Sequence, residues 1–312
     1  MYAKYYNLRK EPFNITPDPH FLYLSKSHKE AIASILYGIK SRKGFIAIVG
    51  EVGTGKTTVV RTYLNSISKK SIKLIYLFNP AISFATLLKD MLDEFDQKPD
   101  SDDCNDMIKQ LHRCLIDEYV KGRNVTLIVD EAQNMPVETL ESLRMLSNLE
   151  TTRDKILQIV LVGQPELEHM LNSHELRQLR SRVAVYTTIQ PLTEKESYEY
   201  IESRIAKVSK DGGRLFSPGA TRRIVRQAKG IPRAINILCD NALMTGFGYQ
   251  SRPVTAHIVR EVIADQTGQH RPDMRKLVDI AGLCAALVTL YWVVNHNGIT
   301  TAMLDMLMGK FS

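Results

Sequence analysis

The chain has 312 residues, of which 44% are hydrophobic and 24% charged, a composition typical of a folded protein with room for one large domain and a smaller one. Its net charge of +7 is compatible with nucleic acid or an anionic membrane surface as a partner, but it selects neither. The four cysteines include no C-x-x-C pair and no metal-ligand spacing, which argues against a metal centre built on cysteine. The first six residues hold no apolar stretch of the kind a signal peptide needs, so we expect the N-terminal part to stay in the cytoplasm.

Residues 1–44 form an N-terminal segment that contains three prolines and ends in a predicted helix at 27–39. Residues 45–190 then alternate apolar, β-branched runs with amphipathic ones. Strands are predicted at 45–49, 72–78, 125–129, 156–162 and 183–189, and helices at 57–67, 84–95, 107–121 and 136–149. This alternation indicates an α/β fold, with a parallel sheet and helices on both faces.

The pattern becomes mostly helical after Pro191. Helices are predicted at 194–210, 218–228, 232–245 and 255–265. We therefore expect residues 191–268 to form a second, smaller, all-α domain.

A basic linker at 269–276 precedes an apolar run at 277–294, in which Asp279 is the only charge. A helix of that length spans about 27 Å, close to the hydrocarbon core of about 30 Å. The run is therefore predicted to be a transmembrane helix, and the alternative is a buried helix of a soluble domain. The positive charges of the linker place it in the cytoplasm, with a short tail at 295–312 in the periplasm.

Residues 50–57 match the phosphate-binding pattern G-x-x-x-x-G-K-[ST] between a predicted strand and a predicted helix. They are Gly50, Glu51, Val52, Gly53, Thr54, Gly55, Lys56 and Thr57. Glycines let backbone N–H groups close around phosphate oxygens, and the following helix presents its N-terminus to the anion. Lys56 is expected to reach the phosphates and the Thr57 hydroxyl to bind Mg²⁺. The alternative is a glycine-rich turn followed by a surface lysine.

Two carboxylates, Asp130 and Glu131, end the predicted strand at 125–129. Downstream of a phosphate-binding loop, Asp130 is expected to hold Mg²⁺ and Glu131 to polarise the attacking water. Gln164 follows the next strand and is expected to lie beside Asp130, where its amide could contact a phosphate or the water. Each of these residues could instead be an ordinary strand end or turn.

Arg233 opens a predicted helix directly after Pro232, a residue that suits the first helical position. It is expected to contact the nucleotide, and the alternative is a surface or capping role.

With these residues, the chain resembles the AAA+ ATPases, and more narrowly the secretion ATPase family typified by general secretion pathway protein A (ExeA-type). The resemblance covers about residues 1–265. Its matching runs are Met1-Tyr2, Pro12-Phe13, Thr16–Pro19, Phe21–Ser25, His28, Glu30-Ala31, Tyr37–Ile39, Gly44-Phe45, Gly50–Thr58, Asp130–Asn134, Val162–Leu167 and Gly230–Asn236.

The resemblance implies an ATP- and Mg²⁺-dependent AAA+ site, with residues 191–268 as its lid domain and Thr58 as part of the phosphate-binding loop. It places the segment from Phe21 to His28, including Tyr23, near the adenine. It also implies a homo-oligomeric ring, with a hexamer favoured. Arg177, Arg180 and Arg182 precede the predicted strand at 183–189, in the segment that faces the neighbouring subunit in such rings. Arg180 or Arg182 is therefore a candidate arginine finger, and the alternative is a solvated helix face.

For the whole molecule, the resemblance implies a bacterial inner-membrane ATPase that serves type II secretion, pilus biogenesis of the mannose-sensitive type, or exopolysaccharide export. Longer members carry a periplasmic peptidoglycan-binding domain after the membrane helix, where this chain has only residues 295–312. We therefore expect a partner protein to supply that domain.

Two other functions stay open at the level of sequence. A DNA-binding AAA+ ATPase of the transposition or replication-initiator type shares the same motifs, and its phosphate contacts would come from Arg222, Arg223, Arg226 and Lys229. Those residues are also compatible with a solvated helix face. A nucleotide-gated scaffold with little turnover is disfavoured by the presence of Lys56, Asp130 and Glu131.

Overall fold

A computed structural model of the chain describes residues 2–16, 18–66, 71–268 and 289. The chain divides into two units, at residues 1–259 and 260–312. The predicted transmembrane helix at 277–294, apart from Thr289, and its flanking segments at 269–276 and 295–312 lie outside the described residues. Within the described ranges, no helix combines the length and apolar character needed to cross a membrane.

The described part of the first unit contains one five-stranded parallel sheet in the order β2-β3-β4-β1-β5. Its strands are β1 (Phe45–Gly50), β2 (Ile72–Leu77), β3 (Asn124–Val129), β4 (Leu157–Gly163) and β5 (Val183–Ile189). β3, β4 and β1 are neighbours, with Val129 beside Leu161 and Val49 beside Gly163. The loops that leave the carboxyl ends of these strands therefore meet at one edge of the sheet.

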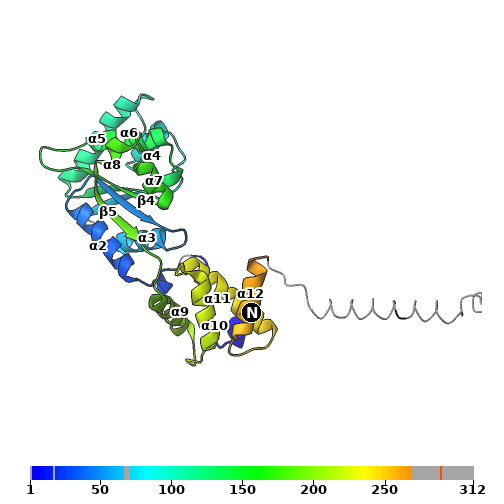
Figure 1. Cartoon of the computed structure of the whole chain (residues 1–312). Coiled ribbons are helices and arrows are strands. Elements are labelled where there is room, and N and C mark those ends of the chain that lie inside the picture. The colour runs from blue at the N-terminus through cyan, green and yellow to red at the C-terminus, as the bar shows by residue number, and fades with distance from the viewer. Residues whose placement is uncertain (1, 17, 67–70, 269–288, 290–312) are drawn as a thin grey trace, which may run out of the picture. The chain divides into compact units, whose positions relative to one another are not determined.

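Helices cover both faces of this sheet (Figure 1), as the strand–helix alternation predicts. One face carries α2 (Lys26–Lys40) and α3 (Lys56–Ser66). The other carries α4 (Phe84–Asp93), α5 (Cys104–Val120), α6 (Val137–Leu146), α7 (Pro165–Leu171) and α8 (Arg177–Arg180). Along β1, Ile46 and Ile48 pack towards α2 and α3, whereas Phe45, Ala47 and Val49 face the larger cluster. This alternation follows from the two-residue period of a strand.

Four helices follow the sheet in the chain, namely α9 (Glu194–Val208), α10 (Pro218–Ala228), α11 (Pro232–Gly248) and α12 (Ala256–Gln266). The short α1 (Tyr2–Tyr5) packs on α11, where Tyr2 donates a hydrogen bond to Asp240 and the rings of Tyr5 and Phe247 lie 5.4 Å apart. Past α1, Arg9 N donates to Val208 O at 2.9 Å. The N-terminal segment therefore contacts α9 and α11 before the chain enters α2.

The observed helices differ from the predicted ones in a few places. α5 begins at Cys104 rather than Met107, because the Asp103 carboxylate accepts hydrogen bonds from Asn105 N at 2.8 Å and Asp106 N at 3.2 Å. α6 ends at Leu146 rather than Leu149. α7 is not among the predicted helices, although its first residue, Pro165, is a recognised start signal. Two 3₁₀ turns, at Pro19–Phe21 and Ala132–Asn134, are also not predicted.

Candidate nucleotide-binding site

The phosphate-binding pattern forms the loop between β1 and α3, with Lys56 as the first residue of the helix. Lys56 is only 6% exposed, and its Nζ donates to Gly50 O at 2.7 Å and Glu51 O at 3.0 Å. Burial lowers the pKa of this amine, while the nearby carboxylates of Glu131 and Asp130 act in the opposite direction. The cation thus lies inside the loop, held by carbonyl oxygens that a phosphate could replace.

Thr57 and Asp130 meet beside the lysine. The Thr57 hydroxyl donates to Asp130 Oδ1 at 3.1 Å, and the same oxygen accepts from Glu131 N at 3.0 Å. Burial raises the pKa of the Asp130 carboxyl, and these two hydrogen bonds oppose that rise. A hydroxyl and a carboxylate are the hard oxygen donors that Mg²⁺ prefers, and the ion commonly binds through one or two such groups together with substrate phosphates. Among the described residues, no group of three or more His, Cys, Asp or Glu side chains is placed to hold a metal ion.

Glu131 is separated from the end of β3 by Asp130 and has a left-handed backbone, with φ of 50°. Its Oε2 accepts from Gln133 Nε2 at 2.6 Å and from Gln164 Nε2 at 2.8 Å. Gln164 N also donates to Gln133 Oε1 at 3.1 Å. Two amides therefore hold one carboxylate oxygen. Gln164 is a predicted site residue, whereas Gln133 is not, although Gln133 lies in the same run as the two acids.

Arg233 is placed against the loop by its own backbone, because Arg233 N donates to Gly53 O at 3.2 Å. A Cβ on Gly53 would come within 2.8 Å of Arg233 Cβ, so glycine is needed for this approach. Gly230, with φ of 77°, makes the turn before α11, and a Cβ there would clash with Leu192 O. These two glycines explain how the start of α11 reaches the phosphate-binding loop.

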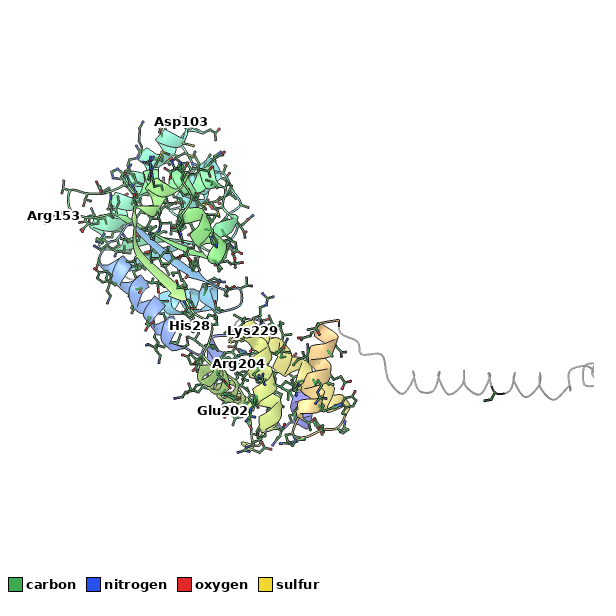
Figure 2. The ribbon with its side chains drawn as sticks, viewed as in Figure 1. His28, Asp103, Arg153, Glu202, Arg204 and Lys229 are labelled. Carbon is green, nitrogen blue, oxygen red and sulfur yellow. The ribbon has the colours of Figure 1, made fainter. Side chains whose placement is uncertain are left out.

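His28 connects α2 to the same loop. Its Nδ1 accepts from Ser25 N at 3.2 Å, so the ring proton lies on Nε2, which donates to Thr54 O at 2.9 Å. His28 is 3% exposed, and burial lowers its pKa. The hydroxyl of Tyr23 donates to Glu199 Oε2 at 2.8 Å. His28 and Tyr23 both line a cavity at this site, and Figure 2 labels His28 near the start of α2.

A cavity of about 540 Å³ joins these parts, within the range of about 300–1,000 Å³ usual for ligand pockets. Its lining includes Lys56, Thr57, Glu131 and Arg233. The N-terminal segment contributes Asn14, Ile15, Thr16, Asp18 and Phe21–Tyr23. Three residues that the sequence analysis did not propose as site residues, Tyr200, Arg204 and Asn236, also line it.

Arg180 and Arg182 are not among the residues that line this cavity. The Arg180 guanidinium lies over the ring of Tyr186, 5.4 Å from its centroid. Arg182 donates to the hydroxyl of Ser147 and to Asn148 Oδ1, the latter at 2.7 Å. The structure thus brings together every predicted loop, acid, amide and helix-start residue, and leaves the two candidate arginine fingers elsewhere.

Comparison with known proteins agrees with this geometry. The AAA domain family model matches residues 39–171. General secretion pathway protein A of Aeromonas hydrophila is 38% identical over 255 residues, which are 81% of this chain and 46% of that protein. The chain therefore spans less than half the length of this relative. A shorter match, 38% identical over 81 residues, covers 24% of this chain and 26% of the Mu-like prophage FluMu DNA transposition protein B of Haemophilus influenzae.

Solved structures share the fold at low sequence identity. The ORC2 protein of Aeropyrum pernix, in its ADPNP–ADP complexes, has a TM-score of 0.60 at 20% identity, covering 82% of this chain and 72% of that one. CDC6P of Pyrobaculum aerophilum has a TM-score of 0.60 at 15% identity, covering 79% and 68%. On its sequence relatives and its domain match, the chain belongs to the AAA+ ATPases, in the family of general secretion pathway protein A.

Proposed function

We propose that this chain binds ATP with Mg²⁺ and hydrolyses it at the site described above. The observation that carries the proposal is the convergence of Lys56, Thr57 and Asp130, with the Thr57 hydroxyl 3.1 Å from Asp130 Oδ1 and the buried lysine on the loop carbonyls. A structural turn needs neither a buried cation nor a half-buried carboxylate beside it, and removing charged groups from water is costly.

In this proposal, backbone N–H groups of residues 50–58 and the Lys56 ammonium hold the phosphates. Thr57 and Asp130 would hold Mg²⁺, which when bound neutralises charge on the phosphates. Arg233, whose backbone is hydrogen-bonded to Gly53, would add a positive charge on the same side.

Glu131 is the proposed base, which accepts a proton from the water that attacks the terminal phosphate. Its Oε2 is oriented by Gln133 and Gln164 at 2.6 Å and 2.8 Å. A carboxylate held by two amides cannot rotate freely. It would therefore keep one orientation towards the attacking water.

Catalysis is proposed to need a neighbouring subunit, in a homo-oligomeric ring for which a hexamer is favoured. Arg180 and Arg182 lie away from the cavity of their own chain, as residues that act on an adjacent site would. Arg182 is engaged with Ser147 and Asn148 of its own chain, so Arg180 is the preferred arginine finger.

We further propose that the chain is anchored in the bacterial inner membrane by residues 277–294, with the ATPase site in the cytoplasm and residues 295–312 in the periplasm. The apolar sequence of that run supports the anchor. The name of the Aeromonas relative supports a role in secretion, among the envelope machines that include type II secretion systems, pili and exopolysaccharide exporters. A partner protein would supply contacts in the periplasm.

Calorimetric titration of the full chain with ATP and Mg²⁺ tests the proposed site. Lys56→Ala removes the charge that faces the phosphates and should weaken ATP binding by about tenfold or more, the effect of losing one or two charge-assisted hydrogen bonds. Lys40→Ala, at an exposed position on α2, should bind as the wild type does. Equal affinity of the Lys56 variant and the wild type would refute the site.

A DNA-binding role is a second candidate because α10 exposes Arg222, Arg223 and Arg226, followed by the exposed Lys229. The name of the Haemophilus relative also refers to DNA transposition. Fluorescence anisotropy with a labelled duplex at about 50 mM and about 200 mM salt would test it, since phosphate contacts give a steep salt dependence. Absence of binding at the lower salt concentration would remove this candidate.

A further inference from the structure

The exposed face of α10 carries basic side chains and no acidic ones. Arg222, Arg223 and Arg226 are exposed on the helix, and the exposed Lys229, labelled in Figure 2, follows its last residue. We call these four side chains the α10 basic face. None of them forms an ion pair with another residue in the part of the chain that the structure describes.

The surrounding sequence leaves this positive charge unbalanced. Between residues 211 and 259 the only acids are Asp211 and Asp240, and each accepts a hydrogen bond from a side chain outside the α10 basic face. Arg222 and Arg226 are four residues apart on one side of the helix, where like charges repel each other. An exposed helix face needs only polar residues, and charges of mixed sign would serve the fold better. The fold alone therefore does not account for the α10 basic face.

The proposed membrane anchor would keep this face near a lipid surface. α12 ends at Gln266, and only the ten residues 267–276 separate it from the apolar run at 277–294. Ten residues span at most about 36 Å, so a chain anchored by that run keeps its helical region close to the bilayer. Basic residues next to a membrane segment, as in the linker at 269–276, are attracted to anionic headgroups.

The chemistry of the α10 basic face fits phosphate headgroups. Three of its four residues are arginines, whose guanidinium groups form paired hydrogen bonds with phosphate oxygens. None of the large hydrophobic side chains exposed in the described part of the chain lies on α10, so the face suits the headgroup layer rather than the hydrocarbon. Duplex DNA also presents phosphates, but it would have to reach α10 by diffusion. The anchor instead holds lipid headgroups at a high effective concentration.

We infer that the α10 basic face binds the anionic headgroups of the membrane in which the chain is anchored, and so orients the helical region on the bilayer. This inference rests on the proposed anchor at 277–294. Lys229 is four residues before Arg233, whose N–H donates to Gly53 O of the phosphate-binding loop. The lipid contact therefore adjoins the candidate nucleotide site.

The experiment compares the full chain in nanodiscs of phosphatidylcholine alone with nanodiscs that contain about 30% phosphatidylglycerol. An amine-reactive reagent modifies exposed lysines, and mass spectrometry gives the rate at each position. Lys229 should react about threefold or more slowly in the anionic nanodiscs, because headgroups cover it. Lys98, exposed between α4 and α5, is the internal reference and should react equally in both. Salt at about 0.5 M should remove the protection of Lys229.

The triple variant Arg222→Gln, Arg223→Gln, Arg226→Gln keeps Lys229 as the reporter and removes the other charges of the face. Each charge near an anionic surface contributes about a fivefold preference for it, so this variant should lose the protection. The matched control removes the same net charge at three exposed positions elsewhere, Lys29→Gln, Lys40→Gln and Lys195→Gln, and should retain it. Thermal melting shows whether each variant is folded, and the wild-type comparison of the two lipids decides the test if the arginine variant does not fold.

Equal reactivity of Lys229 in neutral and anionic nanodiscs would overturn the inference, and so would loss of protection in the control variant, since net charge alone would then be responsible. Protection of Lys229 by duplex DNA but not by anionic lipid would also overturn it, in favour of the DNA-binding candidate. Release of the wild type from membranes by alkaline carbonate would instead contradict the proposed anchor itself, so the two failures are distinguishable.

Discussion

Glu131 owes its orientation to neighbours that come from two different loops. Gln133 lies in the turn after β3, and Gln164 follows β4. Gln133 also accepts from Gln164 N, so its side chain both orients the carboxylate and positions the second amide. Its role is therefore to position Glu131 rather than to contact the reacting atoms.

Gln133→Ala should consequently lower kcat by about tenfold, as expected for the loss of a hydrogen bond to a charged group, without changing the Kd for ATP. Phosphate-release kinetics and calorimetric titration measure the two quantities. Gln178→Ala, at an exposed position on α8, is the control. A change in Kd with constant kcat would show that Gln133 supports nucleotide binding instead.

His28 gives the stability of the protein a pH dependence with a definite sign. Burial lowers the pKa of His28 in the folded protein, whereas the unfolded chain has a histidine pKa of about 6.5. Below that pH the unfolded state binds the proton more readily, so the free energy of unfolding falls as pH drops and is unaffected by this group at higher pH.

Denaturant unfolding at about pH 7.5 and about pH 5.5 should therefore show a loss of stability in the wild type that is smaller in His28→Gln. His174→Gln, which changes an exposed histidine, should retain the wild-type loss. An identical loss in all three proteins would show that His28 is not the titrating group.

The residues of the phosphate-binding loop and the acid after β3 could be predicted, because each lies in a contiguous sequence motif. Lys56 and Thr57 lie in one eight-residue pattern, and Asp130 ends a recognisable strand. Arg204 and Asn236 could not be predicted in the same way, because they lie on separate helices and meet only through the packing of α9 against α11. Asn236 does lie in the run Gly230–Asn236, which matches the secretion ATPase family and also contains Arg233. This match is the signal in the sequence that could have identified Asn236.

At the scale of elements, the predicted strands agree closely with the observed ones. β1 and β4 are buried along their whole length and are therefore continuous apolar runs in the sequence. β1 extends the prediction only to Gly50, and the edge strand β5 coincides with its predicted range. Helix ends were less predictable, since they depend on capping by particular side chains such as Asp103. The docking of α11 on the loop required a tertiary contact, Arg233 N to Gly53 O, that no local pattern specifies.

Gly230 tests this docking at the element scale. Gly230→Ala places a Cβ against Leu192 O at a φ of 77°, and it should destabilise the protein by about 1–3 kcal/mol. Gly248→Ala, at the end of α11 with no atom within 4 Å of the added Cβ, should cause no loss. Denaturant unfolding measures both variants, and equal stabilities would contradict the described turn.

At the scale of the whole molecule, the candidate site is built from distant parts of the chain. The N-terminal segment, the phosphate-binding loop and α11 all line one cavity, and Lys207 Nζ on α9 donates to His20 O at 2.8 Å. A nucleotide bound there would contact all of these parts at once, so we expect binding to stabilise their arrangement.

The proposed ring predicts complementation between two inactive variants. Arg180→Ala lacks the finger but keeps Glu131, whereas Glu131→Gln lacks the base but keeps Arg180. Mixed oligomers contain interfaces that combine an intact site with an intact finger, so mixing should restore ATPase activity that neither variant has alone. Arg182→Ala serves as the comparison. Lack of recovery in confirmed mixed oligomers would exclude Arg180 as a residue that acts between subunits.

The proposed role of Glu131 in ATP hydrolysis is tested by steady-state phosphate release from the wild type and Glu131→Gln, measured together with the Kd for ATP. The wild type should hydrolyse ATP. The variant should bind ATP at least as tightly, while its rate falls by about 10²–10⁴-fold, the usual contribution of a general base. Hydrolysis at the wild-type rate by Glu131→Gln, or none by the wild-type oligomer, would contradict this role.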